Sequence, residues 1–221
     1  MAGPVFLSFD KKVAYYLQWK SVFKSMIVPA LFYLIWDIWF TKQGIWSFNE
    51  KYITGYHLFN LPIEEVLFFF VVPFCCLFIY VCIKTYFPDI RHRKLTDMMM
   101  KLTGIVLTIM ALTHLQQDYT FYTFMLNTLF ILLLYIFRKK YFTSLNVTVF
   151  VLAYVVMLIP FLIVNGLLTS IPVVLYNDAE NLGIRIGTIP VEDIFYGMLL
   201  IWGNVLGYEY FNSRGVLSDN K

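Results

Sequence analysis

Two short acidic motifs are the part of this chain best suited to chemistry. The segment Leu61–Val66 (LPIEEV) recurs 128 residues later as Ile189–Ile194 (IPVEDI), and each copy opens a long apolar run. Carboxyl groups at the end of a membrane helix are costly, so they suggest a functional site. Neighbouring carboxyl groups withdrawn from water cannot all ionise. A cluster of them can therefore supply a protonated acid and an ionised base together. The duplication indicates two related half-sites.

These motifs contribute most of the catalytic candidates. Asp37 joins them because it lies about one helical turn from the outer end of the first apolar run, at a similar depth. The catalytic candidates are Asp37, Glu64, Glu65, Glu192 and Asp193. A proline near a helix start followed by acids is also ordinary helix-entry chemistry. The second copy, together with the match of Asp37 to Asn165 at the same offset, favours a function.

Polar and aromatic residues near the acids are candidates for binding a substrate. They are Asn165, Trp36, Phe68, Tyr196, Asn49 and Asn177. We expect the aromatic rings to line a pocket for a flat conjugated ligand or to stabilise a cation. We expect the two loop asparagines to border a narrow polar opening. No dinucleotide fingerprint, Walker loop or metal-ligand spacing is found, so we expect redox-neutral chemistry with no cofactor and no metal.

The composition is that of an integral membrane protein. Of the 221 residues, 60% are hydrophobic and only 14% are charged, whereas a soluble domain averages about 25% charged residues. We therefore predict an all-α membrane protein, because each apolar run is close to the ~20 residues that cross a bilayer. The six predicted spans are 22–40, 61–83, 97–116, 119–137, 146–168 and 189–211.

The basic residues predict the orientation. Of 17 lysines and arginines, all but Lys42, Lys51 and Arg185 fall in the termini or in loops on one side of the predicted spans. The positive-inside rule places both termini in the cytoplasm of a multi-pass protein in the cell membrane. A net charge of +3 requires no nucleic acid partner. Cys75, Cys76 and Cys82 lie in one span and are interpreted as packing residues.

The offset of 128 extends beyond the motifs. It aligns Phe48-Asn49 with Tyr176-Asn177 and Gly55 with Gly183. We predict two parallel three-helix repeats, a common arrangement in membrane proteins. The predicted boundaries are 1–90 for the first repeat, 91–118 for a linker helix and 119–221 for the second repeat. By this alignment the first helix of the first repeat is absent from the sequence.

The motifs and their surroundings resemble a known family. The segments Gly55–His57, Leu61–Phe70 and Gly183–Asp193, with Phe48-Asn49, are similar to those of the membrane-embedded, flavin-independent lycopene cyclases. Some members of that family are two small subunits and others are one fused chain, and fungal members are joined to phytoene synthase. This chain resembles the single-chain fusion of both halves.

The resemblance implies an activity and a mechanism. An acid protonates the terminal double bond of lycopene or a related acyclic carotenoid, a six-membered ring closes, and a base removes a proton. A β ring is the expected product, and contact with other carotenoid-pathway enzymes is expected. For this reaction we expect Glu64, Glu65, Glu192 and Asp193 to share the acid and base roles, with Asp37 and Asn165 in support, and the sequence does not assign which is which. Two alternatives stay open at this point: a small transporter or channel with an intramembrane carboxylate site, and a non-catalytic membrane subunit.

Overall fold

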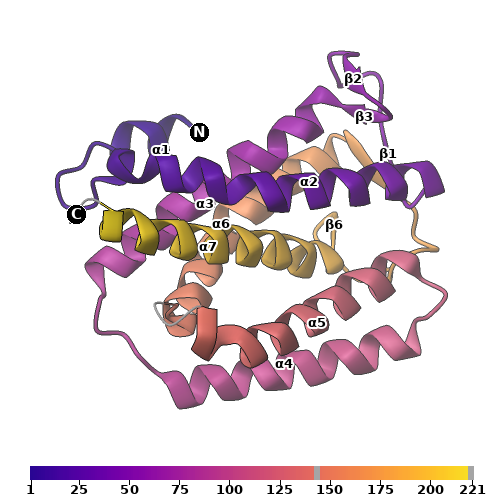
Figure 1. The fold of residues 1–221 in the computed structure, drawn as a ribbon. Helices are drawn as coiled ribbons and strands as arrows, with labels where there is room; N and C mark the ends of the chain where they lie inside the picture. The colour runs from indigo at the N-terminus through magenta and orange to yellow at the C-terminus, as the bar shows by residue number, and fades with distance from the viewer. Residues whose placement is uncertain (142–144, 219–221) are drawn as a thin grey trace.

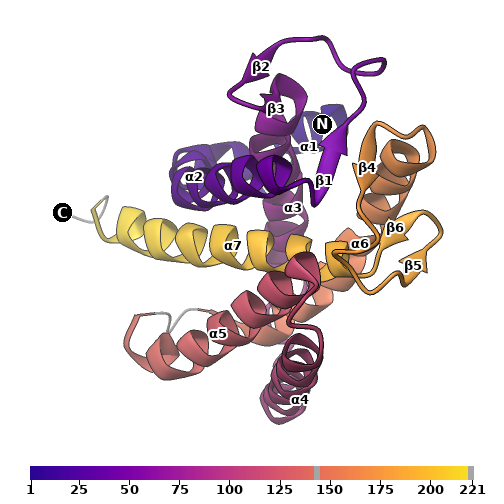
Figure 2. The same ribbon diagram turned by 90° about the vertical axis from the view of Figure 1, so that its right-hand side faces the viewer.

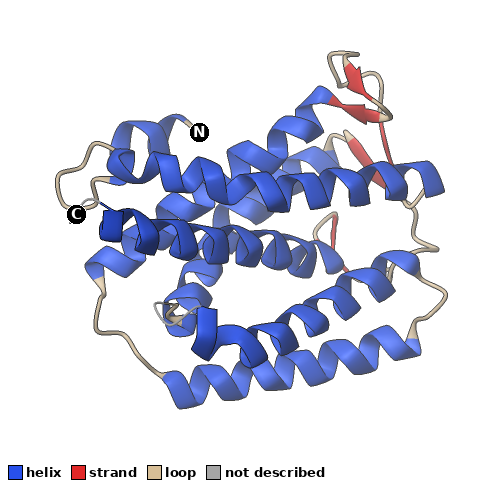
Figure 3. Ribbon diagram, in the orientation of Figure 1, coloured by secondary structure: helices blue, strands red, loops and turns tan. Residues whose placement is uncertain are grey.

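The computed structural model describes residues 1–141 and 145–218, which form a bundle of helices with three short strand pairs at one end (Figure 1, Figure 3). The helices are α1 (Ala2–Leu7), a 3-10 turn (Tyr15–Gln18), α2 (Trp19–Gln43), α3 (Ile63–Tyr86), α4 (Arg93–Thr113), α5 (Asp118–Tyr141), α6 (Val147–Ser170) and α7 (Glu192–Ser218). Of the basic residues used for the orientation, Lys221 lies outside the described residues, and the side chains of Lys139 and Arg214 are not described.

The strands are β1 (Trp46–Phe48), β2 (His57–Leu58), β3 (Leu61–Pro62), β4 (Val174–Tyr176), β5 (Arg185–Ile186) and β6 (Ile189–Pro190). Two of the pairs, β2 with β3 and β5 with β6, are hairpins that lead directly into α3 and α7. The third pair joins the two halves of the chain, because β1 lies antiparallel to β4 with Ser47 opposite Leu175. The acidic motifs therefore enter their helices at the end of the bundle that carries the strands.

All six predicted spans are helices. Five helical segments are long and apolar enough to cross a membrane, counting only the described residues: Tyr15–Gln43, Ile63–Tyr86, Arg93–Thr113, Asp118–Arg138 and Val147–Ser170. The helix in the sixth span, α7, is not among these five. It lies at the centre of the bundle (Figure 2), in contact with α2, α3, α5 and α6, and it buries Asn204 and Glu209. A central helix faces protein more than lipid, so it tolerates a more polar sequence.

The elements of the second half follow those of the first at the same offset of 128. Thus α2 and α6 begin at Trp19 and Val147, and β3 and β6 begin at Leu61 and Ile189. Helices α2 and α6 both end at the β1–β4 pair, and α3 and α7 both start at that end of the bundle and run away from it (Figure 1). The order α2, β1, hairpin, α3 is therefore repeated as α6, β4, hairpin, α7, with the same direction in each half.

Helices α2 and α7 pack closely because glycines lie where they cross. A Cβ atom on Gly203 would lie 3.2 Å from Pro29 Cγ, and one on Gly207 would lie 3.0 Å from Ser25 Cβ. Small residues let two membrane helices approach closely and gain van der Waals contact. This interface fixes α2, which carries Asp37, against α7, which carries Asp193.

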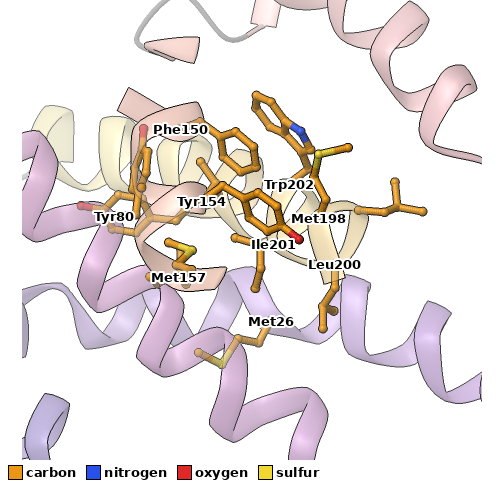
Figure 4. Packing of buried hydrophobic residues seen from close by; sticks show 14 of the residues in the cluster. Met26, Tyr80, Phe150, Tyr154, Met157, Met198, Leu200, Ile201 and Trp202 are labelled. Atoms are coloured by element: carbon orange, nitrogen blue, oxygen red, sulfur yellow. The ribbon is translucent and has the colours of Figure 1, made fainter. Parts of the chain in front are cut away.

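The main hydrophobic core includes a stack of rings between α6 and α7. The Trp202 ring stacks on Phe150 with centroids 3.4 Å apart, and Tyr154, Met157 and neighbouring aliphatic side chains surround the stack (Figure 4). Trp202 is fully buried, and burying a side chain of this size gives a large packing gain. The stack holds α6 beside α7, further from the strand pairs than the acidic motif of α7.

Candidate active site

A pocket lies under the β1–β4 pair, enclosed by α2, α3, α6 and α7 with one residue from α5. Its lining residues are Asp37, Trp46, Phe48, Glu65, Phe68, Val72, Cys76, Tyr119, Tyr154, Met157, Leu158, Phe161, Asn165, Leu168, Thr169, Val174, Tyr176, Asp193, Tyr196, Gly197, Leu200 and Ile201. Both halves of the chain contribute to it. Its polar residues gather at the strand end, and its remaining length is apolar.

Three of the five predicted acids line this pocket. Asp37 comes from α2, Glu65 from α3 and Asp193 from α7. Asp37 is buried, and its Oδ2 atom has no hydrogen-bond partner among the described residues. Glu65 is half-buried and likewise receives no hydrogen bond within residues 1–141 and 145–218. The structure thus brings an acid from the first motif and an acid from the second motif into one pocket.

Asp193 has a different environment, because three donors converge on it. Tyr119 donates its hydroxyl to Oδ1 in a short hydrogen bond. Tyr176 donates to Oδ2 at 2.8 Å, and the Asn165 amide lies 3.4 Å from the same oxygen. Asp193 itself is 3% exposed. Hydrogen bonds of this kind fix the orientation of a carboxylate and stabilise its charge.

Four aromatic rings form a box at the polar end of the pocket. The Trp46 ring centroid lies 5.3 Å from that of Tyr119 and 5.8 Å from that of Tyr196. Tyr119 stacks on Tyr176 at 5.9 Å. The negative faces of aromatic rings attract a cation that lies over them. The box therefore suits a reaction in which positive charge develops on a carbon skeleton.

The apolar part of the pocket follows one face of α3. Glu65, Phe68, Val72 and Cys76 recur at helical spacing on that face, opposite Phe161 and its neighbours on α6. At 1.5 Å per residue, the distance along α3 from Glu65 to Cys76 is about 16 Å. A long, flat, apolar molecule could lie along this face with its end at the carboxyl groups.

The other two predicted acids do not line the pocket. Glu64 is exposed, and it accepts a hydrogen bond from the backbone N–H of Thr54 at 2.7 Å. Its counterpart Glu192 accepts a hydrogen bond from the backbone N–H of Leu182 at 2.8 Å. In both motifs the donor lies ten residues before the acid. Glu192 is fully buried and also accepts from the Thr120 hydroxyl at 2.6 Å. In each motif the first acid therefore ties down the preceding loop, while the second acid faces the pocket.

Of the predicted substrate-binding residues, Asn165, Phe68 and Tyr196 line the pocket and three do not. Trp36 is buried behind Tyr196, with ring centroids 5.0 Å apart. Asn49 accepts the backbone N–H of Lys51 at 3.1 Å, and Asn177 makes the equivalent bond at 3.1 Å. Such bonds are typical of asparagines that stabilise turns.

One contact between an acidic and a basic side chain spans each loop, at matching positions in the two halves. His57 Nε2 lies 3.5 Å from Glu50, and Arg185 pairs with Asp178, which stands 128 residues after Glu50. The hydrogen bond from Arg185 lowers the pKa of the Asp178 carboxyl below its usual value. His57 and Arg185 thus contact loop acids, and neither contacts an acid of the pocket among the described residues.

The pocket also contains functional candidates that the sequence analysis missed, above all Tyr119 and Tyr176. The alignment of Tyr176 with Phe48 carried a usable signal, because a hydroxyl in one repeat replaces a hydrogen in the other. Tyr119 carried none, since its helix, α5, follows the linker and matches no predicted span of the first repeat. As for metals, no group of three or more His, Cys, Asp or Glu side chains in the described ranges is arranged to hold one.

Fold and site together define a multi-helix membrane protein with a carboxyl-lined apolar pocket. Comparison with known families gives a match to the lycopene cyclase model over residues 1–83 and 116–211. Because this match covers most of the chain, the chain belongs to the lycopene cyclase family. The prediction of that family is therefore confirmed.

One curated relative matches more distantly. It is the bifunctional lycopene cyclase/phytoene synthase of Aspergillus oryzae, which is 25% identical over 65 residues. The match covers 29% of this chain and only 11% of the relative. No solved structure matches the chain.

Proposed function

We propose that this protein closes a six-membered β ring at the end of lycopene or a related acyclic carotenoid by acid–base chemistry, with no net redox change. The observation that carries the proposal is the convergence of Asp37, Glu65 and Asp193 in one apolar pocket beside a box of aromatic rings. Membership of the lycopene cyclase family supports the same reaction class.

The proposed reaction begins with a proton from a pocket carboxyl group. The proton adds to the CH carbon of the terminal double bond and leaves a tertiary cation on the dimethyl carbon. The π electrons of the next double bond attack this cation, so a carbon–carbon bond closes the ring and the charge moves to a ring carbon. A pocket carboxylate then removes a neighbouring proton, and the ring double bond forms. One proton is added and one is lost, so the product is an isomer of the substrate.

The position of the pocket supports entry from the lipid. Phe68 and Phe161 belong to α3 and α6, two helices with the length and composition of membrane spans. A carotenoid is insoluble in water, so we expect it to pass sideways between these helices. The end group would reach the carboxyl groups, and the rest of the polyene would follow α3 into the bilayer.

The proposed topology has both termini in the cytoplasm of a multi-pass cell-membrane protein. It places the strand end of the bundle, with the pocket acids, near the outer interface. Contact with other carotenoid-pathway enzymes at this membrane remains part of the proposal. The proposed turnover requires no flavin or metal, because every proposed step is a proton transfer or a bond rearrangement.

The direct test is pigment analysis in cells that accumulate lycopene. Expression of the chain should convert lycopene into carotenoids with β end rings. Glu65→Gln and Asp193→Asn should each lower ring formation by roughly 10²- to 10⁴-fold, the usual contribution of general acid–base catalysis.

Glu64→Gln is the matched control for these variants. It changes the neighbouring acid of the same motif, which lies outside the pocket and keeps an oxygen for the Thr54 N–H. This variant should cyclise at close to the wild-type rate. Unchanged lycopene in cells that accumulate the wild-type protein in their membranes would refute the proposed function.

A further inference from the structure

The local symmetry of the fold makes Glu65 and Asp193 counterparts. The β1–β4 pair is centred on Ser47 and Leu175, which are 128 residues apart. On one side of this centre, the Asn49 backbone N–H donates to the Val173 carbonyl at 2.9 Å. On the other side, the Asn177 backbone N–H donates to the Ile45 carbonyl, also at 2.9 Å. These two bonds exchange under a two-fold rotation that relates one half of the chain to the other. The same rotation relates the second acid of each motif.

The surroundings of the two acids break this symmetry. Where Asp193 receives the Tyr176 hydroxyl, the first half has Phe48, which has no hydroxyl to donate. Where Asp193 faces the Asn165 amide, the first half has Asp37, the counterpart of Asn165, which lines the same pocket as Glu65.

A third donor strengthens the difference. Tyr119, from α5, donates to Asp193, whereas no hydroxyl or amide group in the described ranges donates to Glu65. Three donors thus surround Asp193, whereas Glu65 has none among the described residues and has Asp37 in place of the amide.

These differences decide which carboxyl group retains a proton. Donors directed at a carboxylate favour its ionised form, while two adjacent carboxyl groups out of water cannot both ionise. Asp193 is therefore the better proton acceptor of the two counterparts. Glu65 is the better store of a proton, because it lacks such donors and a further carboxyl group, that of Asp37, lines the same pocket.

We infer that the two halves of this pocket have divided the proton chemistry: Glu65, beside Asp37, delivers the proton to the terminal double bond, and Asp193 removes the proton from the ring cation. Tyr119 and Tyr176 act as positioning residues, since they orient the Asp193 carboxylate. This assignment rests on the proposed function and adds to it which carboxyl group gives the proton and which removes it. In each turnover one proton leaves Glu65 and one arrives on Asp193, and exchange with water restores both groups.

Reactions in deuterated water test the assignment, because they follow the two proton transfers separately. In the Asp193→Asn variant, Glu65 should still deuterate the terminal double bond, but the cation should return a proton to Glu65 instead of losing one to the missing base. Recovered lycopene should therefore gain deuterium at its end groups while ring formation falls. In the Glu65→Gln variant, recovered lycopene should carry no deuterium above the level of a protein-free control.

Tyr176→Phe gives a second measurement and reproduces the side chain found at Phe48. With its base less well oriented, this variant should place the ring double bond less selectively and yield a mixture of ring isomers. Phe48→Tyr, the reciprocal change, adds a hydroxyl on the Glu65 side of the pocket, so it should lower ring formation while leaving the isomer ratio unaltered. A purely structural role for Tyr176 would change the amount of folded protein without changing the isomer ratio.

The outcomes separate this assignment from the proposed function. Wild-type protein that forms no ring and exchanges no deuterium refutes the function itself. If the wild type is active and recovered lycopene gains deuterium with Glu65→Gln but not with Asp193→Asn, the two roles are reversed. Exchange in both variants, or in neither, also overturns the assignment, because Glu65 would then not be the separate source of the proton. Monodisperse elution of each variant after extraction in detergent checks that it has folded.

Discussion

At the scale of single residues, the doubled acidic motif has two distinct parts. The first acid, Glu64 or Glu192, accepts a hydrogen bond from the backbone N–H ten residues earlier and so holds the loop before its motif. The second, Glu65 or Asp193, faces the pocket. Adjacent residues on a helix point about 100° apart, so two neighbouring acids cannot face the same cavity equally. The proline before each pair lets the chain turn from the hairpin strand into the helix.

The loop-holding acids differ in burial, which leads to a prediction on stability. Glu192→Ala should destabilise the protein by about 1–3 kcal/mol, because it leaves the Thr120 hydroxyl and the Leu182 N–H without their buried acceptor. Glu64→Ala changes the matching exposed position and should stay within about 0.5 kcal/mol of the wild type. Thermal unfolding of both variants in one detergent compares them, and equal losses would contradict this account.

At the scale of elements, the sequence predicted the helices well and the facing of their side chains poorly. Hydrophobic length located both ends of every long helix to within four residues, except the end of α7, which extends to Ser218 instead of 211. It placed two helix starts too early, since Leu61-Pro62 and Ile189-Pro190 form hairpin strands. It also gave Glu64 and Glu65 equal weight, because both lie in the first turn of α3. Which of them faces the pocket depends on how α3 is rotated against α6 and α7, and that is decided by tertiary packing.

The interface between α2 and α7 leads to a prediction at this scale. Gly207→Val should destabilise the protein by about 1–3 kcal/mol and lower cyclisation, because the new side chain would press on the backbone and Cβ of Ser25 and push α2 from α7. The control is Gly166→Ala, at a position where a Cβ would meet only Ile189 at an ordinary 3.8 Å. A Gly207→Val protein with wild-type melting temperature would show that the close approach contributes little.

At the scale of the whole molecule, neither half contains a complete site. Asp37 and Glu65 come from the first half, and Asp193 comes from the second. The halves meet through the β1–β4 pair and through the α2–α7 interface. The loop between α3 and α4, residues 87–92, crosses neither of these contacts.

The chain can therefore be divided with an expected result. Residues 1–88 and 91–221, expressed together as two polypeptides, should assemble and form end rings in lycopene-producing cells. Either polypeptide alone should form none, because it lacks part of the carboxyl set. Adding Gly207→Val to the second polypeptide should weaken assembly more than it weakens the intact chain. Ring formation by one polypeptide alone would contradict a site shared between the halves.

The glycines of α7 also bear on how many carotenoid molecules the proposed site could bind at once. By the local two-fold rotation, the counterpart of the proposed entry between α3 and α6 would lie between α7 and α2, where Gly203 and Gly207 let the helices approach closely. The counterparts of Gly203 and Pro29 in α3 and α6 are Cys75 and Met157, so no glycine stands at the position that matches Gly203. On the proposed route from the lipid, the described residues therefore offer one entry, between α3 and α6, and a symmetric substrate would have to insert its two ends one after the other. Processing should be distributive: under scarce enzyme, carotenoid with a single ring should spread through the bilayer before the two-ringed product appears, and a chase with unlabelled lycopene should intercept it.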